Sequence, residues 1–213
     1  IMTALLTIEN LPDLNETITV PEDIFEELTA QDASVAGFNP YEQPTVRDLL
    51  YGVLLPSGAD ACETLARAVG GSEEGFVAMM NQKAEELGLT NTHFENCTGL
   101  HNDNHYSTCR DIAVLMSECL KSDTFREIVT REVYTTEATA SHPEGITLYD
   151  TMLHRFTSYE MSTTLENGAV IEGGKTGFTD EAGQCLVSFA EYGGEEYILV
   201  TAEAMTDSGS AVD

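Results

Sequence analysis

The spacing of apolar residues predicts helices through most of positions 1–130. Residues 1, 2, 5, 6 and 8 form one apolar face at helical spacing. Similar apolar faces predict further helices over about 45–55, 59–69, 72–87, 109–121 and 123–129. Thr45, Ser72 and Thr108 directly precede three of these segments, where their side chains are suited to cap free amide groups. This part of the chain is therefore expected to be mainly helical.

After Arg131 the pattern changes to short β-prone segments. The first is 133–136, followed by a loop with His142-Pro143 and a helical or irregular segment that runs to Tyr159. Three longer strands are predicted over 169–179, 185–192 and 195–204. Gly193-Gly194 between the last two is a hairpin signal. Helices followed by antiparallel strands predict an α+β fold. In this fold a helical cluster (about 1–165) packs beside an antiparallel sheet (about 166–205). The length of the chain fits a single domain over 1–213.

Three segments lack the signals of a capped element. No Ser, Thr, Asp or Asn precedes the first apolar face, so we expect the chain to begin inside a helix, with upstream residues absent. Residues 11–44 are mostly polar and read as a long surface connection, with a strand-like piece at 17–20 and a short helix after Pro21. Residues 206–213 also lack a capped element, which indicates that the C-terminal end is incomplete as well.

Charge and cysteine content narrow the classes of function. The chain has 37 acidic residues against 9 Lys and Arg, for a net charge of −28. Without a basic stripe to neutralise phosphates, nucleic acid is excluded as a partner. No stretch of 18 apolar residues predicts a membrane span. The cysteines lack C-x-x-C spacing, and Cys62, Cys109 and Cys119 fall on predicted helices, where we expect buried free thiols.

Lys175 is one of three lysines in this acidic chain, and it stands in the run Gly173-Gly174-Lys175-Thr176-Gly177. The glycines at 174 and 177 remove side chains on either side of the lysine, so that another group is able to approach the backbone closely. A lone cation in this position points to an anion-binding site. The ordinary alternative is a glycine-rich turn in which the lysine has no special role. The Lys-Thr-Gly tripeptide, taken without its surroundings, would favour this alternative.

Two other candidates have ordinary alternatives, which weigh at least as much as the functional interpretation at Ser57 and more than it at the histidines. Ser57 follows Pro56 at the junction of two predicted helices, where a serine commonly serves as a helix cap. His101 and His105 are four residues apart, but the segment between them reads as a loop and no third metal ligand is indicated. An ordinary polar loop is the favoured interpretation of the two histidines.

Three groups of residues, in the right order, resemble the motifs of one family. They are 45–62 with Pro56-Ser57-Gly58, the combination of 91–94, 98–100 and 106–111, and 174–177 with 180–183. Over nearly the entire chain the sequence is similar to the serine D-alanyl-D-alanine carboxypeptidases, which are low-molecular-mass penicillin-binding proteins. The resemblance implies the fold of the β-lactamase and penicillin-binding-protein superfamily, with residues 1–213 as an incomplete catalytic domain.

The resemblance also implies roles for the residues that match the family motifs S-x-x-K, S-x-N and K-T-G. Ser57 matches the S-x-N serine, a proton relay toward the leaving amine. Lys175 and Thr176 match K-T-G, which holds the terminal carboxylate of the substrate on a strand expected to be interior, with Ser57 across a cleft. Gly177 completes that motif, and the backbone amide of Phe178 would be one oxyanion donor. Neither a metal nor a cofactor is implied.

The chain departs from the family pattern in two respects. In the family, S-x-x-K stands directly before the Ile-Met-Thr-Ala-Leu string, so the nucleophile and its lysine would precede Ile1 and residues 1–213 alone are expected to be inactive. The N-terminal strand hairpin of the family is also missing, which leaves a sheet edge where self-association is possible. Ala59 stands where S-x-N has asparagine, and the lost hydrogen bond would weaken transition-state binding by roughly 1–3 kcal/mol.

The expected function of the parent protein is removal of the terminal D-alanine from peptidoglycan stem peptides through an acyl-enzyme. We expect β-lactams to inhibit it and its place to be outside the cytoplasm of a bacterium. One alternative is a non-catalytic homologue that binds peptidoglycan or D-Ala-D-Ala. Another is a related serine β-lactamase, which would need deacylation machinery that the sequence does not identify.

Overall fold

The apolar face predicted for the first residues becomes the centre of a helical cluster. Residues 2–7 of α1 (Met2–Asn10) are all buried. The computed structural model describes residues 1–204, so the prediction for 206–213 lies outside the described residues. The helices packed around α1 are α3 (Val46–Leu54), α4 (Ala59–Gly70), α5 (Glu73–Glu86) and α7 (Asp123–Val129).

The predicted helix starts are confirmed by their caps. Thr45 and Asp48 form a capping box at α3, in which each side chain bonds the other residue's backbone amide. Ser72 caps α5, and Thr108 caps α6 (Cys109–Cys119). A short α2 (Ile24–Ala30) follows Pro21 as predicted. The strand-like piece at 17–20 forms no strand, and only a single bridge joins Thr17 to Thr45.

The last part of the described chain forms an antiparallel sheet in the order β3-β4-β5. Its strands are β3 (Val170–Thr179), β4 (Gly183–Tyr192) and β5 (Glu195–Ala204). Gly193 and Gly194 turn the β4–β5 hairpin with φ values of 64° and 83°, which suit glycine. Among the described residues β3 is an edge strand of this sheet, so the expectation of an interior strand for Lys175 is wrong.

A second, two-stranded sheet lies between the helices and the main sheet in sequence. It pairs β1 (Val133–Thr135) with β2 (Thr147–Tyr149), and β2 had not been predicted. The ring of Tyr134 stacks on that of Tyr51 in α3 at 3.6 Å, and its hydroxyl donates to Asp48 at 2.9 Å. These contacts hold the hairpin against the helical cluster. The short α8 (Leu153–Ser158) then leads toward β3.

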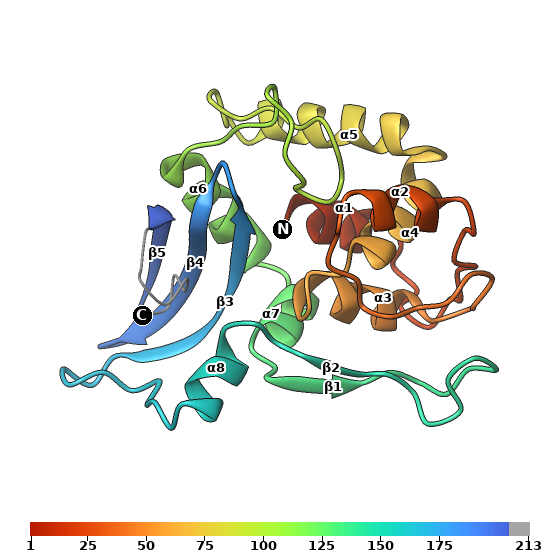
Figure 1. Ribbon diagram of the computed structural model, residues 1–213. Coiled ribbons are helices and arrows are strands. Elements are labelled where there is room, and N and C mark those ends of the chain that lie inside the picture. Colours follow the sequence, from red (N-terminus) through yellow and green to blue (C-terminus); the bar gives the residue numbers. More distant parts are fainter. Residues whose placement is uncertain (205–213) are drawn as a thin grey trace.

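One hydrophobic cluster joins the helices to the sheet. It runs from α1 through α3, α4 and α7 to Val187 and Phe189 of β4. Figure 1 shows the helical cluster on one side, the main sheet on the other, and the N-terminus of α1 between them. The molecule therefore brings the start of α1, the junction of α3 and α4, and β3 into one region.

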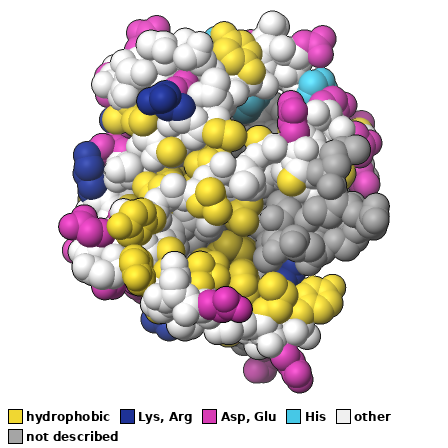
Figure 2. Space-filling model, turned by 90° about the vertical axis from the view of Figure 1, so that its left-hand side faces the viewer, with side chains coloured by type: hydrophobic (Ala, Val, Ile, Leu, Met, Phe, Trp, Pro, Cys, Tyr) yellow, Lys and Arg dark blue, Asp and Glu magenta, His cyan; other side chains and the backbone are white. Residues whose placement is uncertain are grey.

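The surface next to the sheet is partly apolar. Apolar side chains gather in a band on this side of the molecule (Figure 2). Exposed apolar residues on the sheet strands include Val170, Tyr192, Tyr197 and Leu199. No helix among the described residues is long and apolar enough to cross a membrane.

The thiols differ in their exposure. Cys62 and Cys119 are buried as predicted, and burial raises the pKa of each to about 12. Cys109 is exposed, so the expectation of a buried thiol is wrong at that position. It is the first residue of α6, at the end of the helix, while the buried residues Leu115, Met116 and Cys119 lie further along it.

Candidate active site

Ser57 lies in the turn between α3 and α4, with its backbone in the left-handed region at a φ of 62°. For a residue other than glycine, this conformation is less favourable than the usual one by about 1–2 kcal/mol. Contacts with neighbouring residues must therefore stabilise it. Gly58, and not Ser57, is the N-cap residue of α4. The ordinary interpretation of Ser57 as a helix cap is therefore wrong. Its hydroxyl instead accepts a hydrogen bond from the ammonium group of Lys175.

The buried carboxylate of Asp60 fastens the Ser57 turn to the preceding surface segment. Asp60 accepts hydrogen bonds from the backbone amides of Ala36, Gly37 and Phe38 at 2.7, 2.9 and 3.0 Å. Segment and turn are in close contact, since a Cβ added to Gly58 would lie 2.6 Å from the Ala36 Cβ. The polar 11–44 connection thus supports the turn that presents Ser57.

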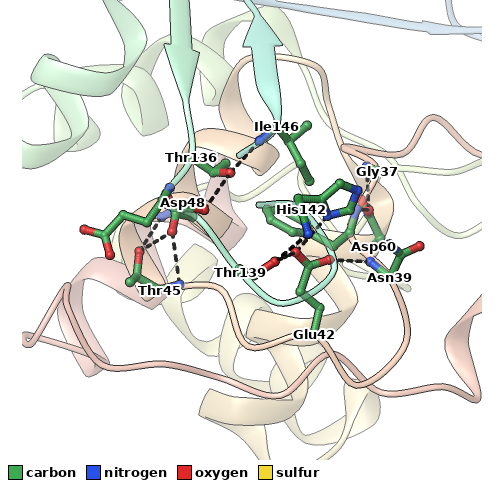
Figure 3. A network of polar contacts seen from close by, with 12 residues as sticks. Gly37, Asn39, Glu42, Thr45, Asp48, Asp60, Thr136, Thr139, His142 and Ile146 are labelled. Carbon is green, nitrogen blue, oxygen red and sulfur yellow. Dashed lines mark hydrogen bonds and ion pairs between the residues drawn. The ribbon is translucent and has the colours of Figure 1, made fainter. Parts of the chain in front are cut away.

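Glu42 holds the other end of this segment to the loop between β1 and β2 (Figure 3). Its carboxylate accepts hydrogen bonds from the Asn39 amide and His142 Nδ1, each at 2.8 Å, and from the Thr139 hydroxyl. Burial alone would raise the pKa of Glu42, but these hydrogen bonds leave it below its ordinary value. Residues 36–42 are consequently held from two sides.

Lys175 projects from β3 toward the Ser57 turn. Its Nζ donates to the Ser57 hydroxyl and to the carbonyl oxygen of Thr176, the latter at 2.7 Å. Burial lowers the pKa of Lys175 to about 8, while Asp150 and Cys62 act in the opposite direction. Because a partly desolvated ammonium interacts more strongly with an anion than one in water, this group is suited to bind a carboxylate.

Asp150 and Thr151 complete the support, and the sequence interpretation missed both. The hydroxyls of Thr151 and Thr176 are 2.5 Å apart, and the Thr151 amide donates to the Leu55 carbonyl at 3.3 Å. Thr151 therefore contacts both β3 and the end of α3. Asp150 accepts hydrogen bonds from backbone amides at the start of α8, yet burial raises its pKa to about 6. An aspartate just before a short helix was the available signal for these contacts.

The glycines around Lys175 serve different purposes. A Cβ at Gly173 would lie 2.3 Å from the Val129 carbonyl oxygen, and one at Gly174 would lie 2.5 Å from that of Val187. These two positions allow close packing within the protein. A Cβ at Gly177 would meet only the Cys185 Cβ, at 3.8 Å. Gly174 and Gly177 were both predicted to let another group approach the backbone, and of these two only Gly177 has open space beside it.

The remaining candidates lie near the same region but differ in what they offer. Ala59 is 4% exposed at the start of α4, and its methyl group offers no hydrogen-bonding atom. Phe178 follows Gly177 on β3, with a side chain that is 61% exposed. Ile1 is half-buried at the start of α1, and Figure 1 places this end of α1 between the helical cluster and the main sheet.

The two candidate metal-binding histidines have separate neighbours. His101 lies 3.4 Å from Asp103 and 3.7 Å from Glu181. The ring of His105 meets Phe94 edge-on, and its Nδ1 accepts the amide of Glu95 at 3.3 Å. These contacts match the polar-loop interpretation.

A groove of about 610 Å³ lies elsewhere, between α6 and β5. Its walls include Arg110, Val114, Lys121 and Val200. Neither Ser57 nor the Lys175-Thr176-Gly177 run lines it. The candidate site is therefore placed at the contact between Ser57 and Lys175 and not in this groove. That contact joins a hydroxyl that is able to transfer a proton to an ammonium group that is able to bind an anion.

Binding of a carboxylate near Lys175 is expected to weaken as the pH rises through about 8. The ammonium must carry its proton to attract the anion, so affinity should fall by up to about tenfold per pH unit above the pKa. Titration with N-acetylalanine from about pH 7 to about pH 10 tests this. Lys175→Arg should remove the pH dependence, because arginine stays charged. An unchanged affinity over this range in the wild-type protein would contradict the role of Lys175.

Comparison with known proteins gives consistent matches over the described residues. A family model described as D-alanyl-D-alanine carboxypeptidase, peptidase S11, matches residues 1–206. The D-alanyl-D-alanine carboxypeptidase DacF of Bacillus subtilis strain 168 is 34% identical over 207 residues, covering 97% of this chain and 50% of that protein. The D-alanyl-D-alanine carboxypeptidase of Streptomyces sp. strain K15 is 36% identical over 206 residues, covering 93% and 68%.

Solved structures agree with these matches. The crystal structure of the Streptomyces K15 DD-transpeptidase has a TM-score of 0.84 at 32% identity, covering 98% of this chain and 79% of that one. The D-alanyl-D-alanine carboxypeptidase of Mycobacterium tuberculosis H37Rv has a TM-score of 0.79 at 27% identity, covering 98% and 73%. The chain spans about half the length of the Bacillus relative.

Proposed function

The chain belongs to the D-alanyl-D-alanine carboxypeptidase family, peptidase S11, and on that premise we propose that its parent protein removes the terminal D-alanine from peptidoglycan stem peptides. The single observation that carries the proposal is the hydrogen bond from Lys175 on β3 to Ser57 in the α3–α4 turn. It joins a cation for the terminal carboxylate to a hydroxyl that is able to pass on a proton. In this proposal residues 1–213 are one catalytic domain that is incomplete at its N-terminus.

The proposed reaction forms and then hydrolyses an acyl-enzyme. The serine of a Ser-x-x-Lys motif attacks the carbonyl of the penultimate D-alanine, and the lysine of that motif takes the hydroxyl proton. Ser57 relays a proton to the departing amine, so that free D-alanine leaves. Lys175 and Thr176 hold the terminal carboxylate, and the Phe178 amide stabilises the oxyanion. Water then releases the shortened peptide and restores the serine.

The sequence of residues 1–213 contains no Ser-x-x-Lys motif. In the proposal this motif stands directly before Ile1, and the place of the start of α1 between the helical cluster and the main sheet (Figure 1) supports that position. The parent protein is then sensitive to β-lactams, which acylate the same serine, and it acts on the cell wall outside the cytoplasm. The stem peptides of peptidoglycan are its substrates.

A fluorescent penicillin provides the direct test. The full-length protein should be labelled covalently at a serine upstream of Ile1, identified by mass spectrometry of the labelled peptide. Residues 1–213 expressed alone should remain unlabelled. Absence of label on the folded full-length protein, under conditions where a known carboxypeptidase reacts, would refute the proposed activity.

Ala59 favours a second candidate function, binding of D-Ala-D-Ala peptides without turnover. The buried methyl group of Ala59 offers no donor to a substrate amide. A non-catalytic protein would bind the peptide without releasing D-alanine, and Ala59→Asn would not produce release. Turnover by the full-length protein with alanine in place would exclude this candidate.

We further propose that β5 is a point of self-association. It is an edge strand among the described residues, with exposed Tyr197 and Leu199. An unpaired edge is able to accept a strand from a second molecule. Sedimentation of residues 1–213 at several concentrations would detect such a dimer, and a concentration-independent monomer would exclude it.

A further inference from the structure

A second cluster of chemically active side chains lies apart from the Ser57–Lys175 site. Glu63 of α4, Glu73 at the start of α5, and Cys97 in the following loop each offer one ligand atom, and these atoms lie within 4.8 Å of one another. Glu63 is 8% exposed and Cys97 is 3% exposed. A pair of neighbouring carboxylates beside a thiol is costly to bury unless another group compensates the charge.

The hydrogen bonds inside the cluster leave one oxygen without a donor. The Cys97 thiol donates to Glu63 Oε1 at 3.3 Å, and the Cys97 amide donates to Glu73 Oε1 at 3.2 Å. Oε2 of Glu63 is buried and accepts no hydrogen bond. Since buried carboxylate oxygens normally have a partner, this atom points to a missing ligand.

The Arg67 guanidinium forms an ion pair with that oxygen but donates no hydrogen bond to it. Arg67 Nε lies 3.7 Å from Glu63 Oε2, too far for a hydrogen bond. The Arg67 guanidinium instead bonds Asp23 at 2.6 Å on the surface.

We propose that Glu63, Glu73 and Cys97 form a binding site for a divalent metal ion of the zinc type. Two carboxylate oxygens and one thiolate form an O₂S donor set, which favours Zn²⁺ or Co²⁺ over Mg²⁺ or Ca²⁺ because sulfur is a soft ligand. Metal–ligand distances of about 2.0–2.3 Å place tetrahedral ligand atoms about 3.5 Å apart. The three ligand atoms now lie within 4.8 Å of one another, so metal binding requires the side chains to move closer, and water is the fourth ligand.

The position of the site indicates a structural role for the ion. The ion joins α4, α5 and the loop that carries Cys97, and the Thr3 hydroxyl ties that loop to α1 by donating to the Cys97 carbonyl at 2.6 Å. α4 begins two residues after Ser57. Metal binding therefore stabilises the framework around the start of α4 and releases the thiol proton.

The test measures binding of Co²⁺ and Zn²⁺ to the full-length protein. Cys109→Ser and Cys185→Ser are first introduced together, because those thiols are accessible and would bind metal nonspecifically. One equivalent of Co²⁺ should give a thiolate-to-metal charge-transfer band, and Zn²⁺ should displace it. Above saturation, each tenfold rise in free Zn²⁺ should shift the unfolding equilibrium about tenfold toward the folded protein.

Cys97→Ser should abolish the charge-transfer band, and Glu63→Gln should weaken binding at least about tenfold. Glu63→Gln should also stabilise the metal-free protein, because it removes one of two neighbouring negative charges. Glu74→Gln, an exposed neighbour on α5, and Cys119→Ala, a buried thiol elsewhere, should leave the band unchanged. A band that persists in Cys97→Ser, or no stabilisation by Zn²⁺, would overturn the proposal and leave a proton shared by Glu63 and Glu73.

Discussion

Replacing Ser57 with alanine in the full-length protein is expected to slow acylation by penicillin by about 10²–10⁴-fold. The hydroxyl of Ser57 bonds Lys175 Nζ, and in the proposed reaction it delivers the proton to the departing nitrogen. Without that hydroxyl, the nitrogen must leave with poor protonation. The rate of labelling by a fluorescent penicillin, measured at several concentrations, gives the second-order rate constant directly.

A second substitution separates this chemical effect from loss of stability. Ser57→Gly also lacks the hydroxyl, but glycine relieves the left-handed backbone at a φ of 62° and should add about 1 kcal/mol of stability relative to Ser57→Ala. Both variants should be equally slow despite their different stabilities. Ser117→Ala, at an exposed position on α6, is the matched control. Acylation of Ser57→Gly at the wild-type rate would exclude the relay.

Gly174→Ala is expected to destabilise the protein by about 3 kcal/mol, through overpacking between β3 and its neighbours. The added Cβ would lie 2.5 Å from the Val187 carbonyl oxygen and 2.9 Å from Met152 Sδ. Both the sheet ladder and the start of α8 would have to move. For a chain of this size the melting temperature should fall by about 6–12 °C, as measured by thermal unfolding.

Gly177→Ala is the matched control on the same strand. Its Cβ would come no closer than 3.8 Å to the atoms of the described residues, so stability should change by less than about 0.5 kcal/mol. If Gly174→Ala and Gly177→Ala melt at the same temperature, the close packing of β3 does not limit stability. If Gly177→Ala loses carboxylate binding but keeps its stability, the bound ligand occupies the space beside Gly177.

The helices and turns that depend only on residues close together in the sequence were predictable from it. Thr45, Ser72 and Thr108 each cap a helix a few residues away, and the Gly193-Gly194 hairpin depends only on two local φ angles. Such contacts arise wherever the local sequence permits them. The α+β class followed from the order of these elements, and the structure confirms it.

The candidate site was only partly predictable. Composition and spacing marked Lys175, but for Ser57 they gave equal weight to a helix cap, and it was the family resemblance that favoured chemistry. The hydrogen bond between the two residues spans 118 positions of sequence. Asp150 and Thr151 were missed because their importance lies in contacts with β3 and α3 rather than in a motif.

The sequence by itself therefore determined the helices, the hairpin, the acidic surface and the family motifs, since each depends on residue type or on short-range spacing. Tertiary structure alone decided that β3 is an edge strand, that Ser57 faces Lys175, and that Gly174 serves packing while Gly177 faces open space. It also brought Glu63, Glu73 and Cys97 together. The physical reason is that packing of the hydrophobic core fixes which distant segments meet, and no local pattern records that choice.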